Sequence, residues 1–247
     1  MLFGNTTSRS PYDWNFALFD IPVRVHPLFW LTSLLLGLGN PEPTQVLIWV
    51  CVCFVSILIH ELGHALTMRY YGWRPSITLH GFGGYASYGE LPYHSSGRRA
   101  QHPVGAHILI TAAGPLAGFL FAGVVISGLY IAGRSLPFPF LDEPIGRGQP
   151  VMDPVWFSIL TDLLYVNVFW GIVNLFPVWP LDGGQIARYM LMASNPVDGY
   201  GQSLTLSLFA GVLLAVAAVV RFEQPYMAMM FGLLAYDSFQ LLQQRRS

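Results

Sequence analysis

The sequence predicts an all-α polytopic membrane protein with about six transmembrane helices and a membrane-associated β-hairpin between the second and the third. Composition is the first observation: 53% of the 247 residues are hydrophobic and only 10% are charged, whereas an ordinary soluble domain has about 25% charged residues. The second is a series of six apolar segments. The third is a stretch rich in glycine and aromatic residues between two of them. The net charge of −1 gives no indication of a nucleic-acid partner.

The six apolar segments are residues 27–38, 44–71, 104–132, 155–176, 204–220 and 225–242. A helix that crosses a membrane needs about 20 residues, so the first segment is short for a crossing. Extending it back to Phe16 lengthens it but includes Asp20 and Arg24, and whether it spans stays open. In the third segment, Gly114 and Gly118 form a small-xxx-small pair, which allows helices to approach closely.

The composition of the connections between these segments also predicts structure. Residues 77–94 contain the glycines and aromatics that favour a hairpin over a helix, and such a hairpin can dip into the membrane where protein covers it. Residues 134–153 are rich in Pro and Gly and are expected to form an extramembrane connection. We divide the chain into an N-terminal cytoplasmic segment, residues 1–26, and a transmembrane domain, residues 27–247.

Arginine placement predicts the orientation of the chain. If all six segments cross, nine of the twelve basic residues lie on the side of the N-terminus. Cytoplasmic loops carry an excess of basic residues, so we expect a multi-pass protein of the cell membrane with both termini in the cytoplasm. A first segment that does not span would relocate only Arg9 and Arg24.

A polar cluster ends the second apolar segment. His60 and His64 are four residues apart, so on a helix they share one face and can bind one zinc ion through their ring nitrogens. Glu61 is positioned for the general-base role of the H-E-x-x-H arrangement. Ionisable residues are costly inside a membrane segment and are rarely without function there. A metal would supply the partner that these three residues need.

Catalytic zinc has three protein ligands and one open position, so a third ligand is expected. Asp182 is the best candidate, because two helix-breaking prolines precede it and two glycines follow it, and such an interruption can line a polar cavity. The alternative is that Asp182 is an N-cap residue. The other histidines, for which loop or interface roles are expected, are His26, His80, His94, His102 and His107.

Together these motifs resemble the site-2 protease family of intramembrane zinc metalloproteases. The resemblance rests on the H-E-x-x-H motif from His60 to His64 and on the run Asn174-x-x-Pro-x-x-Pro-Leu-Asp-Gly-Gly that ends at Gly184. The AAGPLAG stretch, residues 112–118, is similar to the family's Gly-Pro motif. The GFGG stretch, residues 81–84, resembles its membrane re-entrant hairpin.

The resemblance implies a zinc endopeptidase that cleaves a transmembrane segment of a membrane-anchored protein near the cytoplasmic face of the lipid bilayer, in regulated intramembrane proteolysis. His60, His64 and Asp182 would bind one zinc ion per chain, and Glu61 would be the general base. Asn174 would hold substrate or stabilise the oxyanion; its alternative role is a hydrogen bond between helices. The edge of the hairpin would pair with an unwound substrate segment by strand addition.

The sequence departs from the family pattern at Gly118, where many members have Asn, so any contact of that Asn is absent. No PDZ-sized insertion or CBS-like domain is seen in this chain, so the resemblance is to a minimal form. Two alternatives are a membrane metal transporter that uses the same three ligands as a transit site, and a non-catalytic relative that binds membrane helices. The sequence does not indicate the substrate or the oligomeric state.

Overall fold

The computed structural model describes residues 10–39, 42–81, 83–88, 103–138 and 141–246. Contacts between residues divide this chain into two compact units. The histidine unit contains the described residues up to position 88 together with residues 113–172. The aspartate unit contains residues 103–112 and the described residues from Val173 onward. Each unit is named after its candidate metal ligands and is described by itself.

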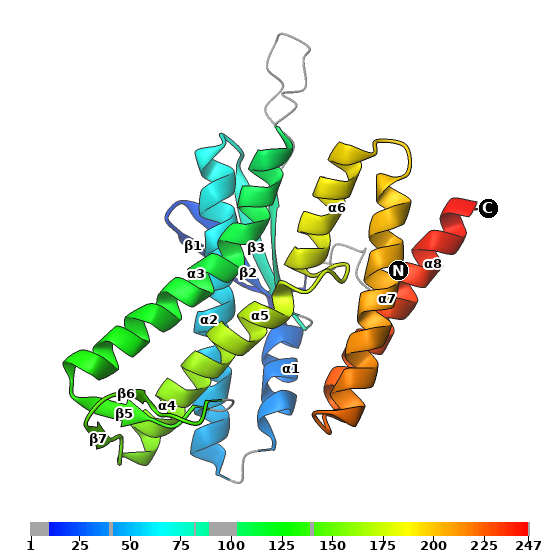
Figure 1. Ribbon diagram of the computed structural model, residues 1–247. Helices are drawn as coiled ribbons and strands as arrows, with labels where there is room; N and C mark the ends of the chain where they lie inside the picture. The colour runs from blue at the N-terminus through cyan, green and yellow to red at the C-terminus, as the bar shows by residue number, and fades with distance from the viewer. Residues whose placement is uncertain (1–9, 40–41, 82, 89–102, 139–140, 247) are drawn as a thin grey trace. The chain divides into compact units, whose positions relative to one another are not determined.

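All six apolar segments form helices (Figure 1). They correspond to α1 (Pro27–Gly37), α2 (Pro43–Tyr70), α3 (Val104–Ile131), the continuous run of α4 (Pro154–Leu164), η1 (Tyr165–Trp170) and α5 (Gly171–Asn174), then α7 (Gly199–Val220) and α8 (Pro225–Arg246). Within the described residues, four of these six are long and apolar enough to cross a membrane: α2, α3, the α4–α5 run and α7. The chain is therefore a multi-pass membrane protein, and the count of six crossings stays a prediction.

Helix α1 is the clearest case of a segment that is too short. Its 11 residues span about 16 Å at 1.5 Å per residue, whereas the hydrocarbon core of a bilayer is about 30 Å thick. His26 begins this helix as its N-cap, and its Nδ1 atom accepts a hydrogen bond from the backbone N–H of Leu28 at 3.2 Å. The segment immediately before His26 is not helical, so it cannot lengthen α1.

A four-stranded sheet forms in the histidine unit, in the order β1-β2-β3-β4. Its strands are β1 (Trp14–Leu18), β2 (Ile21–Val25), β3 (Pro75–His80) and β4 (Gly83–Tyr88). The hairpin expected after the second helix is present as the antiparallel pair β3–β4, while residues 89–94 lie outside the described part. The prediction of a single hairpin was incomplete, because β1 and β2 form another and β2 pairs in parallel with β3.

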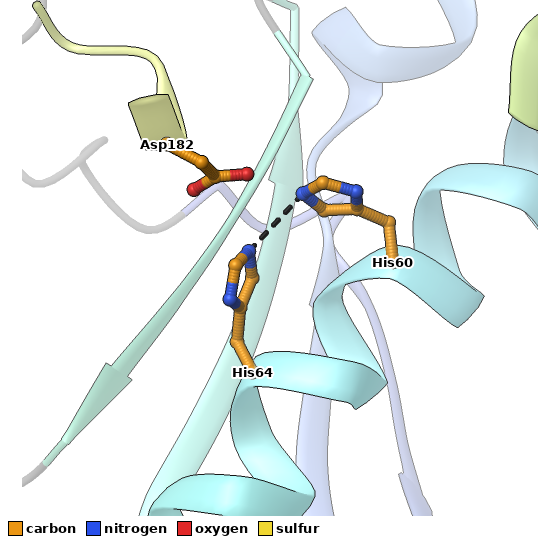
Figure 2. A group of neighbouring side chains, drawn as sticks. All are labelled: His60, His64 and Asp182. Carbon is orange, nitrogen blue, oxygen red and sulfur yellow. Dashed lines mark hydrogen bonds between the residues drawn. The ribbon is translucent and has the colours of Figure 1, made fainter. Parts of the chain in front are cut away.

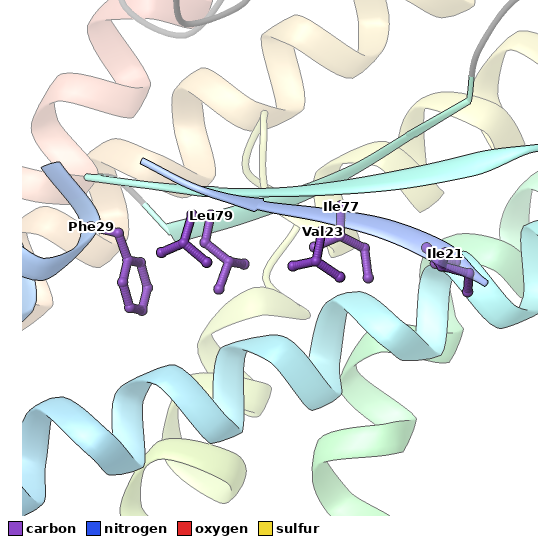
Figure 3. Packing of buried hydrophobic residues seen from close by; sticks show 7 residues of the cluster. Ile21, Val23, Phe29, Ile77 and Leu79 are labelled. Atoms are coloured by element: carbon purple, nitrogen blue, oxygen red, sulfur yellow. The ribbon is translucent and has the colours of Figure 1, made fainter. Parts of the chain in front are cut away.

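The inner face of this sheet forms the main core of the histidine unit. Ile21, Val23, Ile77 and Leu79 are each at most 2% exposed, and they point from β2 and β3 towards α2 (Figure 3). Their spacing is two residues within each strand, which is the period of a strand with one buried face. The core therefore holds the hairpin against α2, the helix that carries His60.

A second, smaller sheet occupies the connection after α3. Its strands are β5 (Arg134–Leu136), β6 (Ile145–Gly146) and β7 (Gln149–Pro150). Leu136 is fully buried with Leu129 of α3 and Leu164 of α4. The short strands thus pack against α3 and α4.

In the aspartate unit, α6 (Asp182–Ser194) precedes the pair α7 and α8, which lie side by side (Figure 1). Gly211 of α7 faces α8, and a Cβ atom there would lie 3.0 Å from Cβ of Ala235. Small residues at this contact allow the two helices to pack closely. Both helices contact the loop before α6, α7 through Ser207 and α8 through Phe231.

Candidate metal centre

The two histidines of the H-E-x-x-H motif converge on α2. Nε2 of His60 lies 3.1 Å from Nε2 of His64, and the ring planes are inclined at 79°. His64 is buried and His60 is half-buried. Figure 2 shows the two rings on successive turns of α2, with a dashed line between these nitrogens. Two imidazole nitrogens aimed at one point from positions i and i+4 match the way histidines bind a single zinc ion.

Gly114 of α3 provides the space in front of these nitrogens. A Cβ atom at position 114 would lie 2.8 Å from Nε2 of His60 and would collide with Nε2 of His64. Gly63 of α2 allows the same close approach from the other helix, since its Cβ would lie 2.8 Å from Cβ of Ala117. The small residues of the AAGPLAG stretch therefore let α3 approach the histidines so closely that no side chain fits between them.

Glu61 is the third polar residue of the motif and is only 4% exposed. Strand β4 lies directly against it: a Cβ atom at Gly84 would lie 2.6 Å from Cγ and 2.7 Å from Oε1 of Glu61. Gly84 is the last glycine of the GFGG stretch, and a side chain at this position would collide with Glu61. The hairpin covers the carboxylate with backbone, and β4 is the last strand in the sheet order.

Asp182 lies in the aspartate unit as the first residue of α6 and is 7% exposed. Leu181, not Asp182, occupies the N-cap position, so the alternative N-cap role for Asp182 is not what the structure shows. The following glycines are required by close packing: a Cβ at Gly183 would lie 2.6 Å from the carbonyl oxygen of Phe176, and a Cβ at Gly184 2.6 Å from the backbone nitrogen of Trp179. The loop thus folds back onto the helix that it starts. Figure 2 also draws the Asp182 carboxylate.

Arg188 also contacts this loop, a role that no sequence pattern indicates. Its guanidinium carbon lies 4.7 Å from the ring centroid of Trp179 and 4.4 Å from that of Tyr200. The backbone N–H of Trp179 also donates to Oγ of Ser207 at 3.0 Å. Cation–π contacts on two rings are long-range features that no local sequence pattern encodes. They hold the loop three residues before Asp182.

The structure places the other candidate residues, Asn174 and the remaining histidines, as follows. Asn174 ends α5 and is half-buried in the aspartate unit. His107 stacks on Tyr189 with ring centroids 4.8 Å apart. His80 lies in β3, where burial, and then the neighbouring charges of His26 and Arg24, lower its pKa below 6.5. His94 and His102 are outside the described residues.

The structure thus brings His60, Glu61 and His64 together in one unit. Asp182 and Asn174 belong to the other unit, at the two ends of one loop. Sequence motifs predict site roles for all five residues, whereas the contacts made by Gly84 and Arg188 become visible only in the fold.

Comparison with known proteins identifies the family. The chain is 29% identical over 231 residues to a zinc metalloprotease of Methanocaldococcus jannaschii, covering 92% of this chain and 56% of that protein. It is 26% identical over 179 residues to stage IV sporulation protein FB of Bacillus subtilis, covering 71% of this chain and 50% of that protein. The chain therefore spans about half the length of these curated relatives.

A solved structure has the same fold. The site-2 protease from Methanocaldococcus jannaschii superimposes with a TM-score of 0.55 at 22% sequence identity, covering 94% of this chain and 95% of that one. The sequence model of peptidase family M50 matches residues 48–218, which is more than half of the chain and includes both motifs. The resemblance to the site-2 proteases is confirmed, and the chain belongs to peptidase family M50.

Proposed function

We propose that the chain is a zinc endopeptidase that cleaves a transmembrane segment of a membrane-anchored protein near the cytoplasmic face of the cell membrane. The observation that carries this proposal is the convergence of Nε2 of His60 and Nε2 of His64, beside the buried Glu61, on a helix apolar enough to span. Membership of peptidase family M50 and similarity to a zinc metalloprotease support it.

The residues present fit a zinc ion. His60, His64 and Asp182 each offer one ligand atom of a type that zinc binds, and Gly114 leaves the space beside both rings open. We therefore assign one zinc ion per chain to these three residues. When bound, zinc supplies Lewis acidity, which activates water and polarises a carbonyl group.

Glu61 acts as the general base. Its carboxylate accepts a proton from the attacking water as the new C–O bond forms, and it returns the proton to the amide nitrogen as the C–N bond breaks. Its burial under the backbone of β4 holds it in one position and limits competing solvent. Asn174 has an amide that can donate a hydrogen bond to the developing oxyanion, or to the substrate backbone.

The hairpin receives the substrate. A helix in a membrane has all its carbonyl groups hydrogen-bonded, so a substrate segment must unwind before it can be cleaved. Strand β4 ends the sheet and can accept an unwound segment by strand addition. Because Gly84 of this strand touches Glu61, a segment paired there lies close to the general base.

The proposed orientation follows from the arginines. With six crossings, both termini face the cytoplasm. The C-terminal end of α2, which carries the H-E-x-x-H motif, and the loop that leads to Asp182 then lie on the same side. Regulated release of a membrane-tethered protein is the biological outcome that we propose. The substrate is a membrane-anchored protein, and the bilayer is the second partner.

Reconstitution separates this function from metal transport. Purified protein in liposomes is supplied with zinc and with solubilised membrane proteins from the same source, and both peptide cleavage and zinc uptake into the lumen are measured. We expect new peptide termini and no uptake above that of empty liposomes. Uptake without any cleavage would instead identify a transporter, and neither activity would identify a non-catalytic relative.

A further inference from the structure

A second polar layer lies one helical turn from the histidines, inside the histidine unit. Ser56 precedes His60 by four residues on α2, and Gly118 follows Gly114 by four residues on α3. Between them lies Asn167 of η1, whose Nδ2 donates to Oγ of Ser56 at 2.8 Å. Ser56 is 2% exposed and Asn167 is 3% exposed. This buried bond connects the helix of the metal ligands to a helix 111 positions further along the chain.

The backbone around Asn167 is unusual. Residues Tyr165–Trp170 form a π-helix between α4 and α5, and π segments within α-helices are often found at functional sites. Nδ2 of Asn167 also donates to the carbonyl oxygen of Leu163 at 2.8 Å. Both hydrogens of the side-chain NH₂ are thus used, one within its own helix and one on α2, and the amide group has a single orientation.

That orientation directs the amide oxygen of Asn167 towards α3. A Cβ atom at Gly118 would lie 3.4 Å from Oδ1 of Asn167, and no described residue donates a hydrogen bond to this buried oxygen. Orphaned buried acceptors are rare, and they are tolerated where the group has a role besides stability.

We propose that Asn167 is a positioning residue for the metal centre, acting through Ser56 on the rotation of α2. This inference rests on the proposed zinc site. Ser56, His60 and His64 lie on one face of α2, so a rotation of the helix at Ser56 turns both rings away from the space that Gly114 of α3 leaves open. Functional groups in such sites must be held within about 10–20° of their working geometry. The Asn167–Ser56 bond supplies this restraint in a layer that has no metal ligand of its own.

Three variants separate positioning from stability: Ser56→Ala, Asn167→Leu and the double variant. Each single change leaves part of the layer without its partner, which destabilises the fold. In the double variant both bonding partners are replaced by apolar groups, and such pairs are often close to neutral for stability. We expect the thermal midpoint of the double variant to recover towards that of the wild type. We expect its zinc affinity to stay about tenfold weaker, as is typical when supporting residues of a metal site are lost.

The measurements are zinc affinity by competition with a chelator, and the visible spectrum of the cobalt-substituted protein, which reports ligand geometry. Leu136→Ala is the matched control, because Leu136 is fully buried on β5 and its loss lowers stability without removing either hydrogen bond of Asn167. It should leave zinc affinity and the cobalt spectrum unchanged.

The outcomes are distinct. If the wild type binds one zinc ion and the double variant binds it equally well with the same cobalt spectrum, the positioning role is wrong while the proposed function stands. The same conclusion follows if Leu136→Ala weakens zinc binding as much as Asn167→Leu does. A wild type that binds no zinc overturns the proposed function and this inference with it.

Discussion

Gly114 of α3 packs its backbone against the ring of His64 on α2 with no room for a Cβ atom, so the close approach of the two helices also leaves the space in front of this candidate metal ligand open. Gly114→Ala should therefore displace His64 and lower the zinc content of the purified protein well below one ion per chain. Atomic emission measures the zinc. Gly123→Ala is the control on the same helix, because nothing lies within 4 Å of a Cβ there, and it should keep its zinc.

Glu61 is expected to move protons and not to bind metal. Glu61→Gln keeps the size of the side chain but removes the base, so cleavage should fall by about 10²–10⁴-fold while zinc stoichiometry stays at one. A cleavage assay and metal analysis on the same preparation test both parts. Loss of zinc from this variant would show that the carboxylate belongs to the ligand set.

Asp182 is expected to be the third ligand. Asp182→Ala should lower both zinc content and activity, and His60→Ala provides the comparison for a lost ligand. If the zinc stoichiometry of Asp182→Ala were unchanged, another residue would have to fill this role, from the remaining histidines or from Glu90, which lies outside the described residues.

A substitution at Gly84 should disturb the general base and leave zinc binding intact. A methyl group at this position would push against Cγ and Oε1 of Glu61, so Gly84→Ala should reduce kcat strongly and leave zinc bound. Ser87→Ala, on the same strand, removes only a hydroxyl that contacts Ser76 at 3.0 Å and should retain most of the activity. Equal activity of Gly84→Ala and the wild type would argue against contact between the hairpin and the base during turnover.

The lowered pKa of His80 should make the stability of the fold depend on pH. Burial, followed by His26 and Arg24, lowers its folded-state pKa below 6.5, so the unfolded chain binds more protons than the folded one as pH falls through 6.5. Stability should then be lost on acidification below about 6.5 and be retained above it. Thermal unfolding in detergent between pH 8 and 5 should show a smaller acid-side loss for His80→Gln than for the wild type.

The helices and the convergence of the two histidine rings could be predicted because their signals are local. Apolar runs of sufficient length specify α2, α3 and α7, and the spacing of His60 and His64 puts both rings on one helix face whatever the rest of the chain does. The loop with Asp182 was recognisable from its prolines and glycines.

The hairpin of β1 and β2 was harder to predict from the sequence, although Ile21, Val23 and Val25 alternate with other residues as in a half-buried strand. This strand is short, it follows an isolated turn, and its pairing partner β3 lies about fifty residues away along the chain. The contacts of Gly84 with Glu61, of Arg188 with Trp179 and of Asn167 with Ser56 are likewise set by tertiary packing. Sequence spacing has no information about which strand or helix will lie opposite.

The most direct test of intramembrane proteolysis is the location of the cleaved bonds. Membranes containing the wild type are compared with membranes containing Glu61→Gln by mass spectrometry of newly formed protein N-termini. We predict new termini within or at the cytoplasmic edge of the transmembrane segment of a membrane-anchored protein, in the wild-type sample alone. Equal termini in both samples, or new termini confined to extramembrane domains, would contradict the account.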